Sequence, residues 1–140
     1  MTQHIRILEF RLYPNQEQET TLNAWLAKCC WIYNHALAMR RDAYKRRKQN
    51  IKYNDQCKWL TGLRDRIESV RLVPVWFERD ALKRIDLAFK AFFRRCKSGA
   101  KKKGFPRFKS ARHYNSMTHC TGNAAENYLG DGRIRVPKLG

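Results

Sequence analysis

The chain has 140 residues, of which 43% are hydrophobic and 12% aromatic, so it can form one ordinary domain with a packed core. Its 30 lysines and arginines outnumber its 12 aspartates and glutamates, which gives a formal net charge of +18. A folded domain this basic repels itself unless it binds an anionic partner, most often nucleic acid. A membrane surface is the competing partner. We disfavour it because the aromatic residues are spread over several predicted elements instead of one amphipathic helix.

No targeting or membrane-spanning segment is expected. The first ten residues include His4, Arg6 and Glu9 and hold no uninterrupted apolar region. No run approaches the roughly 18 apolar residues of a transmembrane helix, so we expect a cytoplasmic protein. The five cysteines lack paired C-x-x-C spacing, which favours reduced, mostly buried thiols over a zinc site built from scattered Cys and His.

The first predicted elements are a strand and a long helix. His4 to Tyr13 is rich in β-branched and aromatic residues, which predicts a strand that ends at Pro14. Asn15 and Gln18 have capping-box spacing, so a helix should run from about Gln16 to Lys48. Its apolar residues recur at spacings of three and four: Leu22, Trp25, Leu26, Cys29, Ile32, Tyr33, Ala36 and Leu37.

The far end of this helix is densely basic. Six of the nine residues from Arg40 to Lys48 are cations. Cations stabilise the C-terminal end of a helix dipole, and that is the simpler interpretation. Six exceed what a dipole requires, so we predict a phosphate-contacting patch. Its expected contacts are Arg40, Arg41, Arg46 and Arg47.

Two further helices are predicted. One runs from about Asp55 to Glu68 with Asn54 as its cap, and the other from about Val75 to Cys96 after the break at Val73-Pro74. The second helix should bury Trp59, Leu60, Leu63 and Ile67. The third has an apolar stripe of Trp76, Ala81, Ile85, Ala88, Phe89, Phe92 and Cys96.

A basic, aromatic loop follows the third helix. Nine cations and no acid occur between Arg94 and Arg112, and such a segment attracts phosphate backbones of any sequence. The predicted nucleic-acid contacts are Arg94, Arg95, Lys101, Lys102, Lys103, Phe105, Arg107, Phe108 and Lys109. Phe105 and Phe108 flank Arg107 and can either stack on unpaired bases or pack into the core. A solvated lysine loop without a partner is the alternative.

The C-terminal part has weaker signals. His113 to Thr121 is weakly strand-like, Gly130-Asp131-Gly132 indicates a turn, and Arg133 to Val136 alternates as a short strand. Strand, helices and strands in this order predict an α+β fold.

The sequence shows no catalytic set. Metal-dependent phosphodiester cleavage requires carboxylates fixed around cations, whereas most acids here lie on predicted polar helix faces where they can form salt bridges. No phosphate-binding glycine loop or Ser/His/Asp set is present. We therefore predict a chain that is not an enzyme and needs no cofactor, and we disfavour a catalytic transposase subunit.

Four motifs together carry a resemblance. They are Phe10 to Asn15 (FRLYPN), Cys29 to Leu37 (CCWIYNHAL), Phe92 to Ser110 (FFRR to GFPRFKS) and Ile134 to Gly140 (IRVPKLG). Each alone is modest, but the chain containing all four in this order closely resembles the TnpB (OrfB) proteins of bacterial insertion sequences. These are RNA-guided DNA nucleases related to type V CRISPR effectors.

The resemblance implies a layout and partners. It implies a helical recognition lobe over residues 15–112, inserted in an incomplete wedge-type β-barrel formed by residues 1–14 and 113–140. Its first helices are also described as a helix-turn-helix, although no specific recognition helix is evident here. The implied partners are guide RNA and DNA. The family's metal-dependent nuclease and zinc-ribbon domains are expected to be absent from this chain, so a truncated, non-functional transposase remnant is the alternative.

Overall fold

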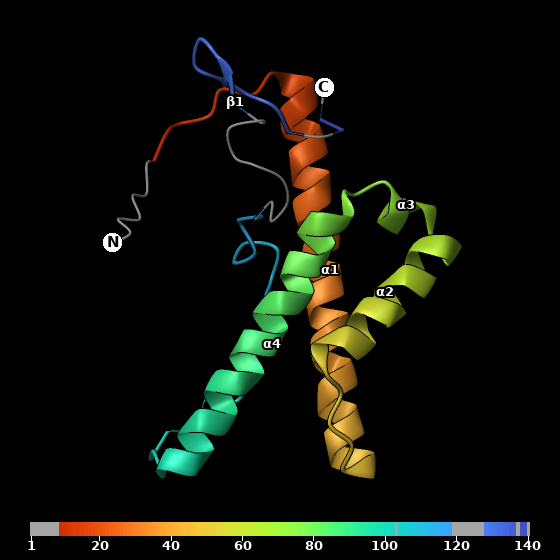
Figure 1. Ribbon diagram of the computed structural model, residues 1–140, viewed down its shortest axis with the longest axis vertical. Coiled ribbons are helices and arrows are strands. Elements are labelled where there is room, and N and C mark those ends of the chain that lie inside the picture. The colour runs from red at the N-terminus through yellow and green to blue at the C-terminus, as the bar shows by residue number, and fades with distance from the viewer. Residues whose placement is uncertain (1–8, 103, 119–127, 137, 140) are drawn as a thin grey trace, which may run out of the picture.

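The described part of the computed structural model comprises residues 9–102, 104–118, 128–136 and 138–139, and it is mostly helical (Figure 1). The elements are α1 (Gln16–Arg47), α2 (Tyr53–Arg66), α3 (Glu68–Arg71), α4 (Val75–Ser98), β1 (Tyr128–Gly130) and β2 (Arg133–Ile134). The helices α1 and α4 pack together and then diverge, and their C-terminal ends both lie at the bottom of Figure 1. None of the helices in these ranges is long and apolar enough to cross a membrane.

The predicted long helix is confirmed: α1 begins at Gln16 as predicted and ends one residue earlier than predicted, at Arg47. Its start is fixed by the predicted capping box, which forms. The backbone N–H of Gln18 donates to Asn15 Oδ1 at 2.8 Å, and the backbone N–H of Asn15 donates to Gln18 Oε1 at 3.0 Å. Lys48 ends the helix in the left-handed region with φ of 54°. Six residues of the predicted stripe are buried: Trp25, Cys29, Ile32, Tyr33, Ala36 and Leu37. Leu22 and Leu26 are only partly buried, and Cys30 is buried although it was not predicted.

The second helix differs from the prediction at its start. It begins at Tyr53, so Asn54 lies inside the helix and is not its cap. The Lys52 amide donates to Asp55 Oδ2 at 3.0 Å, and this acidic side chain in the first turn satisfies one of the free helix-end amides. Leu60 and Leu63 are buried as predicted.

The third predicted helix is confirmed as α4, which continues to Ser98 and ends at Gly99 with φ of 72°. Its N-terminal core residue is Phe77, not Trp76, because the start of the helix turns Phe77 toward α1, where its ring lies 5.7 Å from that of Trp25. Ala81, Ile85 and Phe89 continue the buried stripe.

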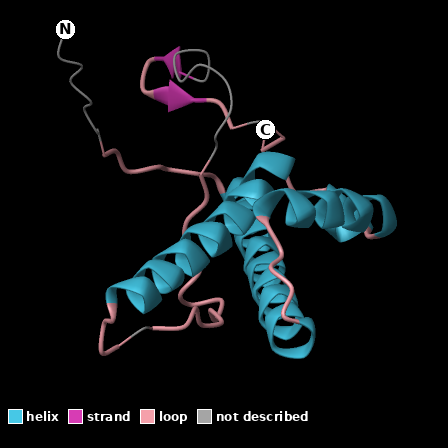
Figure 2. Cartoon of the chain, turned by 60° about the horizontal axis from the view of Figure 1, so that its bottom comes forward, coloured by secondary structure: helices cyan, strands magenta, loops and turns pink. Residues whose placement is uncertain are grey.

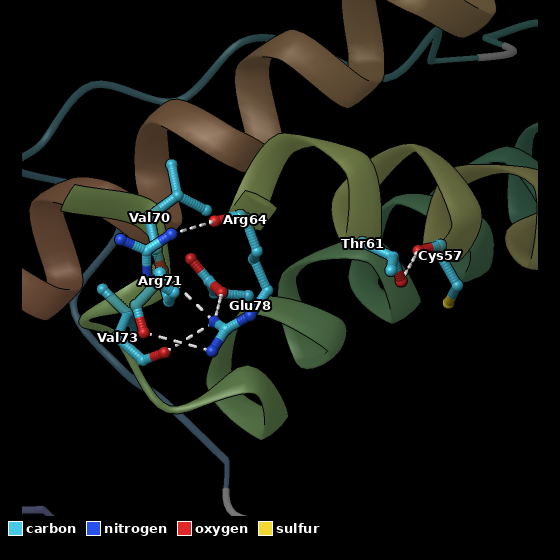
Figure 3. A network of polar contacts seen from close by, with 7 residues as sticks. All are labelled: Cys57, Thr61, Arg64, Val70, Arg71, Val73 and Glu78. Atoms are coloured by element: carbon cyan, nitrogen blue, oxygen red, sulfur yellow. Dashed lines mark hydrogen bonds and ion pairs between the residues drawn. The ribbon is translucent and has the colours of Figure 1, made fainter. Parts of the chain in front are cut away.

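Arg64 organises the junction that leads from α2 through α3 into α4 (Figure 3). Its guanidinium donates to the carbonyl oxygens of Val70, Arg71 and Val73 at 3.2, 3.1 and 2.7 Å. Arg64 also forms an ion pair with Glu78 in the first turn of α4, and the side chain of Glu78 is fully buried. No side chain caps the N-terminus of α4 at Pro74. The hydrogen bonds and the ion pair of Arg64 therefore hold the junction together.

The predicted α+β fold is wrong: the described residues contain no barrel, and their only strands are the antiparallel pair β1 and β2. The two strands flank the predicted turn, and β2 confirms two of the four residues predicted as a strand there. The segments 9–15 and 113–118 form no strand. The parts of the predicted strands at residues 4–8 and 119–121 lie outside the described residues.

The leading segment shows why the strand prediction failed. Phe10, Leu12 and Tyr13 are 78%, 57% and 84% exposed, so their apolar side chains are largely uncovered by the described residues. A strand needs a partner to satisfy its backbone, and residue pattern alone does not provide one. The helices form their core without this segment. The division into a wedge (1–14 and 113–140) and a recognition lobe (15–112) stays a prediction.

Candidate nucleic-acid interface

We call residues 99–114 the return loop, because they lead back from the end of α4 toward α1 (Figure 2). Asn34 of α1 holds the loop through its side-chain amide. Asn34 Nδ2 donates to the Lys109 carbonyl at 2.8 Å, and the Lys109 amide donates to Asn34 Oδ1 at 2.9 Å. The thiol of Cys30 donates to the same carbonyl at 3.2 Å. The Asn34 side chain thus satisfies both backbone groups of Lys109 in a part of the chain without regular secondary structure.

Sequence reasoning missed Asn34, although a signal was present. It is a polar residue next to Tyr33 in the most apolar stretch of α1, and a half-buried amide there requires hydrogen-bond partners. What the sequence does not contain is the identity of the partner, 75 residues further along the chain.

The start of the return loop is shaped by a glycine and an arginine. Gly104 has φ of 63°, and a Cβ placed on it would lie 3.3 Å from Arg95 Nη2. The same guanidinium nitrogen donates to the Gly104 carbonyl at 2.9 Å. Glycine accommodates both the left-handed backbone and the close approach. Arg95 therefore supports the loop from α4 as well as adding charge.

Phe105 and Phe108 were predicted either to stack on unpaired bases or to pack into the core, and the structure places both rings between these alternatives. Phe105 is 39% exposed and meets the rings of Phe89 and Phe92 edge-on, with centroids 5.6 and 5.1 Å apart. Phe108 is 49% exposed, and the Arg41 guanidinium lies 5.0 Å from its ring centroid. Neither ring is fully in the core, and Phe108 joins the return loop to the basic end of α1.

Most predicted cationic contacts are exposed, and they belong to the C-terminal parts of α1 and α4 and to the return loop. Those with exposed side chains are Arg46, Arg47, Arg94, Lys101, Lys102 and Arg107. Lys103 lies outside the described residues. Arg41 and Lys109 are half-buried, and the Lys109 ammonium lies 5.0 Å from the centroid of the Tyr33 ring. The C-terminal ends of α1 and α4, which carry the two predicted patches, point the same way (Figure 1).

Arg40 is the exception, because the structure places it in the core, where it is 7% exposed. Its Nε donates to Gln56 Oε1 at 2.9 Å, and its Nη2 lies 3.2 Å from Asp86 Oδ1. Burial lowers the pKa of Arg40, while hydrogen bonds from Lys90 and Arg40 hold the pKa of Asp86 below its ordinary value despite burial. We treat the pair as charged, since a guanidinium stays protonated at neutral pH. Arg40 is thus not available to a phosphate at the surface.

Burial raises the pKa of two side chains in the core, Cys29 and Tyr114. Burial raises the pKa of the Cys29 thiol to about 12, so it stays protonated and unreactive. Among the residues that the structure describes, no group of three or more His, Cys, Asp or Glu side chains could hold a metal ion.

The molecule is therefore of the class of small, basic, helical proteins in which a hydrogen-bonded loop presents cations and aromatic rings. Comparisons with known proteins confirm the predicted resemblance. The family model HTH_OrfB_IS605, described as a helix-turn-helix domain, matches residues 1–49. Over 138 residues, 97% of this chain, the sequence is 27% identical to the Escherichia coli (strain K12) protein named "Putative RNA-guided DNA endonuclease InsQ". The chain spans about a third (32%) of that protein's length.

The matched segment has a simpler structure than the name of the family model suggests. Its described part, residues 9–49, contains the single helix α1. The turns and further helices follow it, in α2, α3 and α4. No second helix within residues 9–49 is therefore present to enter a DNA groove.

Proposed function

We propose that this chain is the nucleic-acid-binding N-terminal part of a TnpB-like transposon protein, which binds guide-type RNA and DNA through their phosphates and does not itself cleave them. One observation carries the proposal. Two segments about 50 residues apart carry exposed cations, the second segment contains no acid, and the helix ends that carry or lead into these segments both lie at the bottom of Figure 1. The match to the OrfB helix-turn-helix model, and the name of the E. coli relative, support the choice of family and ligand.

We call the proposed surface the basic end. Within the described residues it consists of Arg41, Arg46, Arg47, Arg94, Lys101, Lys102 and Arg107. Such a surface contacts the backbone and reads the shape of a strand or duplex more than its base sequence. Binding should accordingly be strong at low salt, weak at high salt and nearly independent of sequence.

The test is the salt dependence of binding. If six to ten phosphates are contacted, affinity should fall by about 10³–10⁵ between 50 and 200 mM salt. The variant K101A/K102A/K103A should flatten the slope of log K against log salt by up to about three units, with little change in sequence preference. The variant K58A/K83A removes two exposed lysines elsewhere and serves as the control. A slope that the triple variant leaves unchanged would remove the return loop from the interface.

The absence of cleavage is a separate part of the proposal. The 140-residue chain, incubated with guide-type RNA, DNA and Mg²⁺ or Mn²⁺, should leave the DNA intact, because its sequence shows no carboxylate set for metal-assisted hydrolysis. Cleavage that persists after removal of contaminating nucleases would refute this part without affecting the binding proposal.

A non-functional remnant is the second candidate, and the exposed apolar side chains of Phe10, Leu12 and Tyr13 favour it. Such a segment can pair with a second copy and cause aggregation. The remnant predicts aggregation and no salt-dependent binding. The binding module predicts a cooperative melt and the salt slope given above.

A further inference from the structure

A pocket lined mainly by aromatic rings lies between the C-terminal halves of α1 and α4. Tyr44 contributes from α1, Phe92 and Phe93 from α4, and Phe105 from the return loop. The phenylalanine rings contact one another: the Phe92 centroid lies 5.5 Å from that of Phe93 and 5.1 Å from that of Phe105. Packing contacts of this kind hold the rings in place before any ligand arrives.

Three of these rings are only partly covered. Tyr44 is 52% exposed, Phe93 38% and Phe105 39%. An aromatic cluster that the core does not enclose is unusual on a soluble surface and marks a binding site when a fitting ligand can be named.

The surrounding charge identifies that ligand. Cations lie close to these rings: the Lys48 ammonium is 5.5 Å from the centroid of the Tyr44 ring, Arg47 lies one helical turn after Tyr44, and Lys101 and Lys102 precede Phe105 in the sequence. The one acid within four residues of any of these rings is Asp42, which pairs with Arg41 at 3.3 Å. Flat rings bordered by cations fit a ligand that combines a flat ring with phosphates, which is a nucleotide of a single strand.

We propose that an unpaired base of RNA stacks on the exposed faces of Tyr44 and Phe93 at the rim of this pocket, while the neighbouring phosphates contact the cations. The proposal rests on the proposed function and adds a site for a base to a surface argued so far from phosphates alone. RNA is favoured because Gln49 and Asn50 also line the pocket. Their amides can both donate and accept hydrogen bonds, as the 2′-hydroxyl requires, and unpaired RNA bases are commonly held by stacking on aromatic side chains.

The experiment compares alanine variants of exposed aromatic residues on the same chain. Tyr44→Ala and Phe93→Ala should each weaken binding of a ten-nucleotide single-stranded RNA by about 5- to 150-fold, the range of one lost stacked base. Tyr13→Ala is the matched control, because Tyr13 is 84% exposed and precedes α1, roughly 40 Å from Tyr44 along the helix at 1.5 Å per residue. Binding of fully paired RNA should be unchanged in all three variants.

The salt slope separates this proposal from the one on which it rests. Tyr44→Ala and Phe93→Ala should weaken binding at every salt concentration and leave the slope as in the natural chain. A natural chain without a salt-dependent affinity would overturn the proposed function. A steep slope combined with variants no weaker than Tyr13→Ala would overturn only the base site.

Two further arms complete the test. A single-stranded DNA of the same sequence should lose less affinity in the variants than the RNA, and an equal loss would overturn the assignment to RNA. Ultraviolet cross-linking of the natural chain to the RNA should label Tyr44 or Phe93 and not Tyr13, a readout that does not depend on how any variant folds. Labelling confined to other residues would contradict the proposal.

Discussion

The two basic segments have similar compositions but different structural roles. In α1 the helix turns one cation, Arg40, into the core, where Asp86 and Gln56 bind it. In the return loop the backbone of Lys109 is held by Asn34, and Lys101, Lys102 and Arg107 remain exposed. Charge density in a sequence therefore measures the number of cations, whereas secondary structure decides which of them reach a ligand.

The cause of the difference is periodicity. Arg40 lies four residues after Ala36 and three after Leu37, both of them buried, so it falls on the same face of the helix. An irregular loop imposes no such repeat. Lys101, Lys102 and Arg107 of the loop therefore face solvent, whereas Lys109 packs against Tyr33.

The largest expected effect is on stability at Arg40. Arg40→Ala should lower the free energy of unfolding by about 3–5 kcal/mol, because the buried Asp86 carboxylate loses one of its two cationic partners and the buried Gln56 oxygen loses its donor. Arg47→Ala, in the same helix but exposed, should change it by less than about 0.5 kcal/mol. Urea denaturation of both variants measures the contrast. Equal losses would mean that the two arginines are not in different environments.

The buried carboxyl group of Glu78 should make the free energy of unfolding depend on pH. The side chain of Glu78 is fully buried, and Oε2 has no hydrogen-bond partner among the described residues. Burial raises its pKa from 4.5 to about 7, against the opposing effect of Arg64. The folded chain holds this proton more tightly than the unfolded chain. The stability it contributes is therefore complete below about pH 4.5 and is lost as pH rises through about 7.

The measurement is the unfolding free energy between pH 4.5 and 7.5. Each unit by which the pKa of Glu78 differs between the folded and the unfolded chain corresponds to about 1.4 kcal/mol. This value sets the upper limit of the change in unfolding free energy. Glu78→Gln removes the ionisable group and should flatten this part of the profile. An equally steep profile in the variant would assign the pH dependence to other groups.

A smaller loss is expected at Asn34. Asn34→Ala leaves both backbone groups of Lys109 without their side-chain partner and should cost about 1–3 kcal/mol. Trypsin should then cleave the return loop faster, while Asn23→Ala, an exposed residue on the same helix, should leave the rate unchanged. A return loop that is equally resistant in the Asn34 variant would show that its other contacts suffice.

The smallest change concerns the charge at the end of α1. The variant R46A/R47A should flatten the salt slope of single-stranded RNA binding by up to about 1.4 units, since each single-strand phosphate contact contributes roughly 0.7. The stability of the chain should stay the same. If the slope does not change, only the return loop binds phosphates, and the two segments differ in function as well as in structure.

The sequence predicts the helices well and the rest of the fold poorly, for physical reasons. The long helix has local determinants, namely the Asn15–Gln18 capping box and the apolar repeat, and both are formed. The burial of Arg40 was also accessible from the spacing of Ala36 and Leu37. The predicted barrel was wrong because strand pairing depends on partners that a pattern of residues does not specify.

The candidate site also has a part that the sequence predicts and a part that it does not. Its cations and rings could be identified from composition, because a segment with nine cations and no acid is typical of a surface that binds nucleic acid. The link between Asn34 and Lys109, and the pocket shared by Tyr44 and Phe105, depend on three-dimensional packing across separations of more than 60 residues. The sequence marks Asn34 as a polar residue in an apolar stretch, but it identifies neither the partner of Asn34 nor the pocket.

Lysine footprinting tests the central claim most directly. The chain is acetylated with and without a single-stranded RNA, and the modification of each lysine is measured by mass spectrometry. The exposed lysines Lys45, Lys48, Lys101 and Lys102 should be protected together, whereas Lys58 and Lys83, exposed on α2 and the first half of α4, should react as in the free chain. Protection of Lys58 and Lys83 that equals or exceeds that of these four lysines would contradict the account.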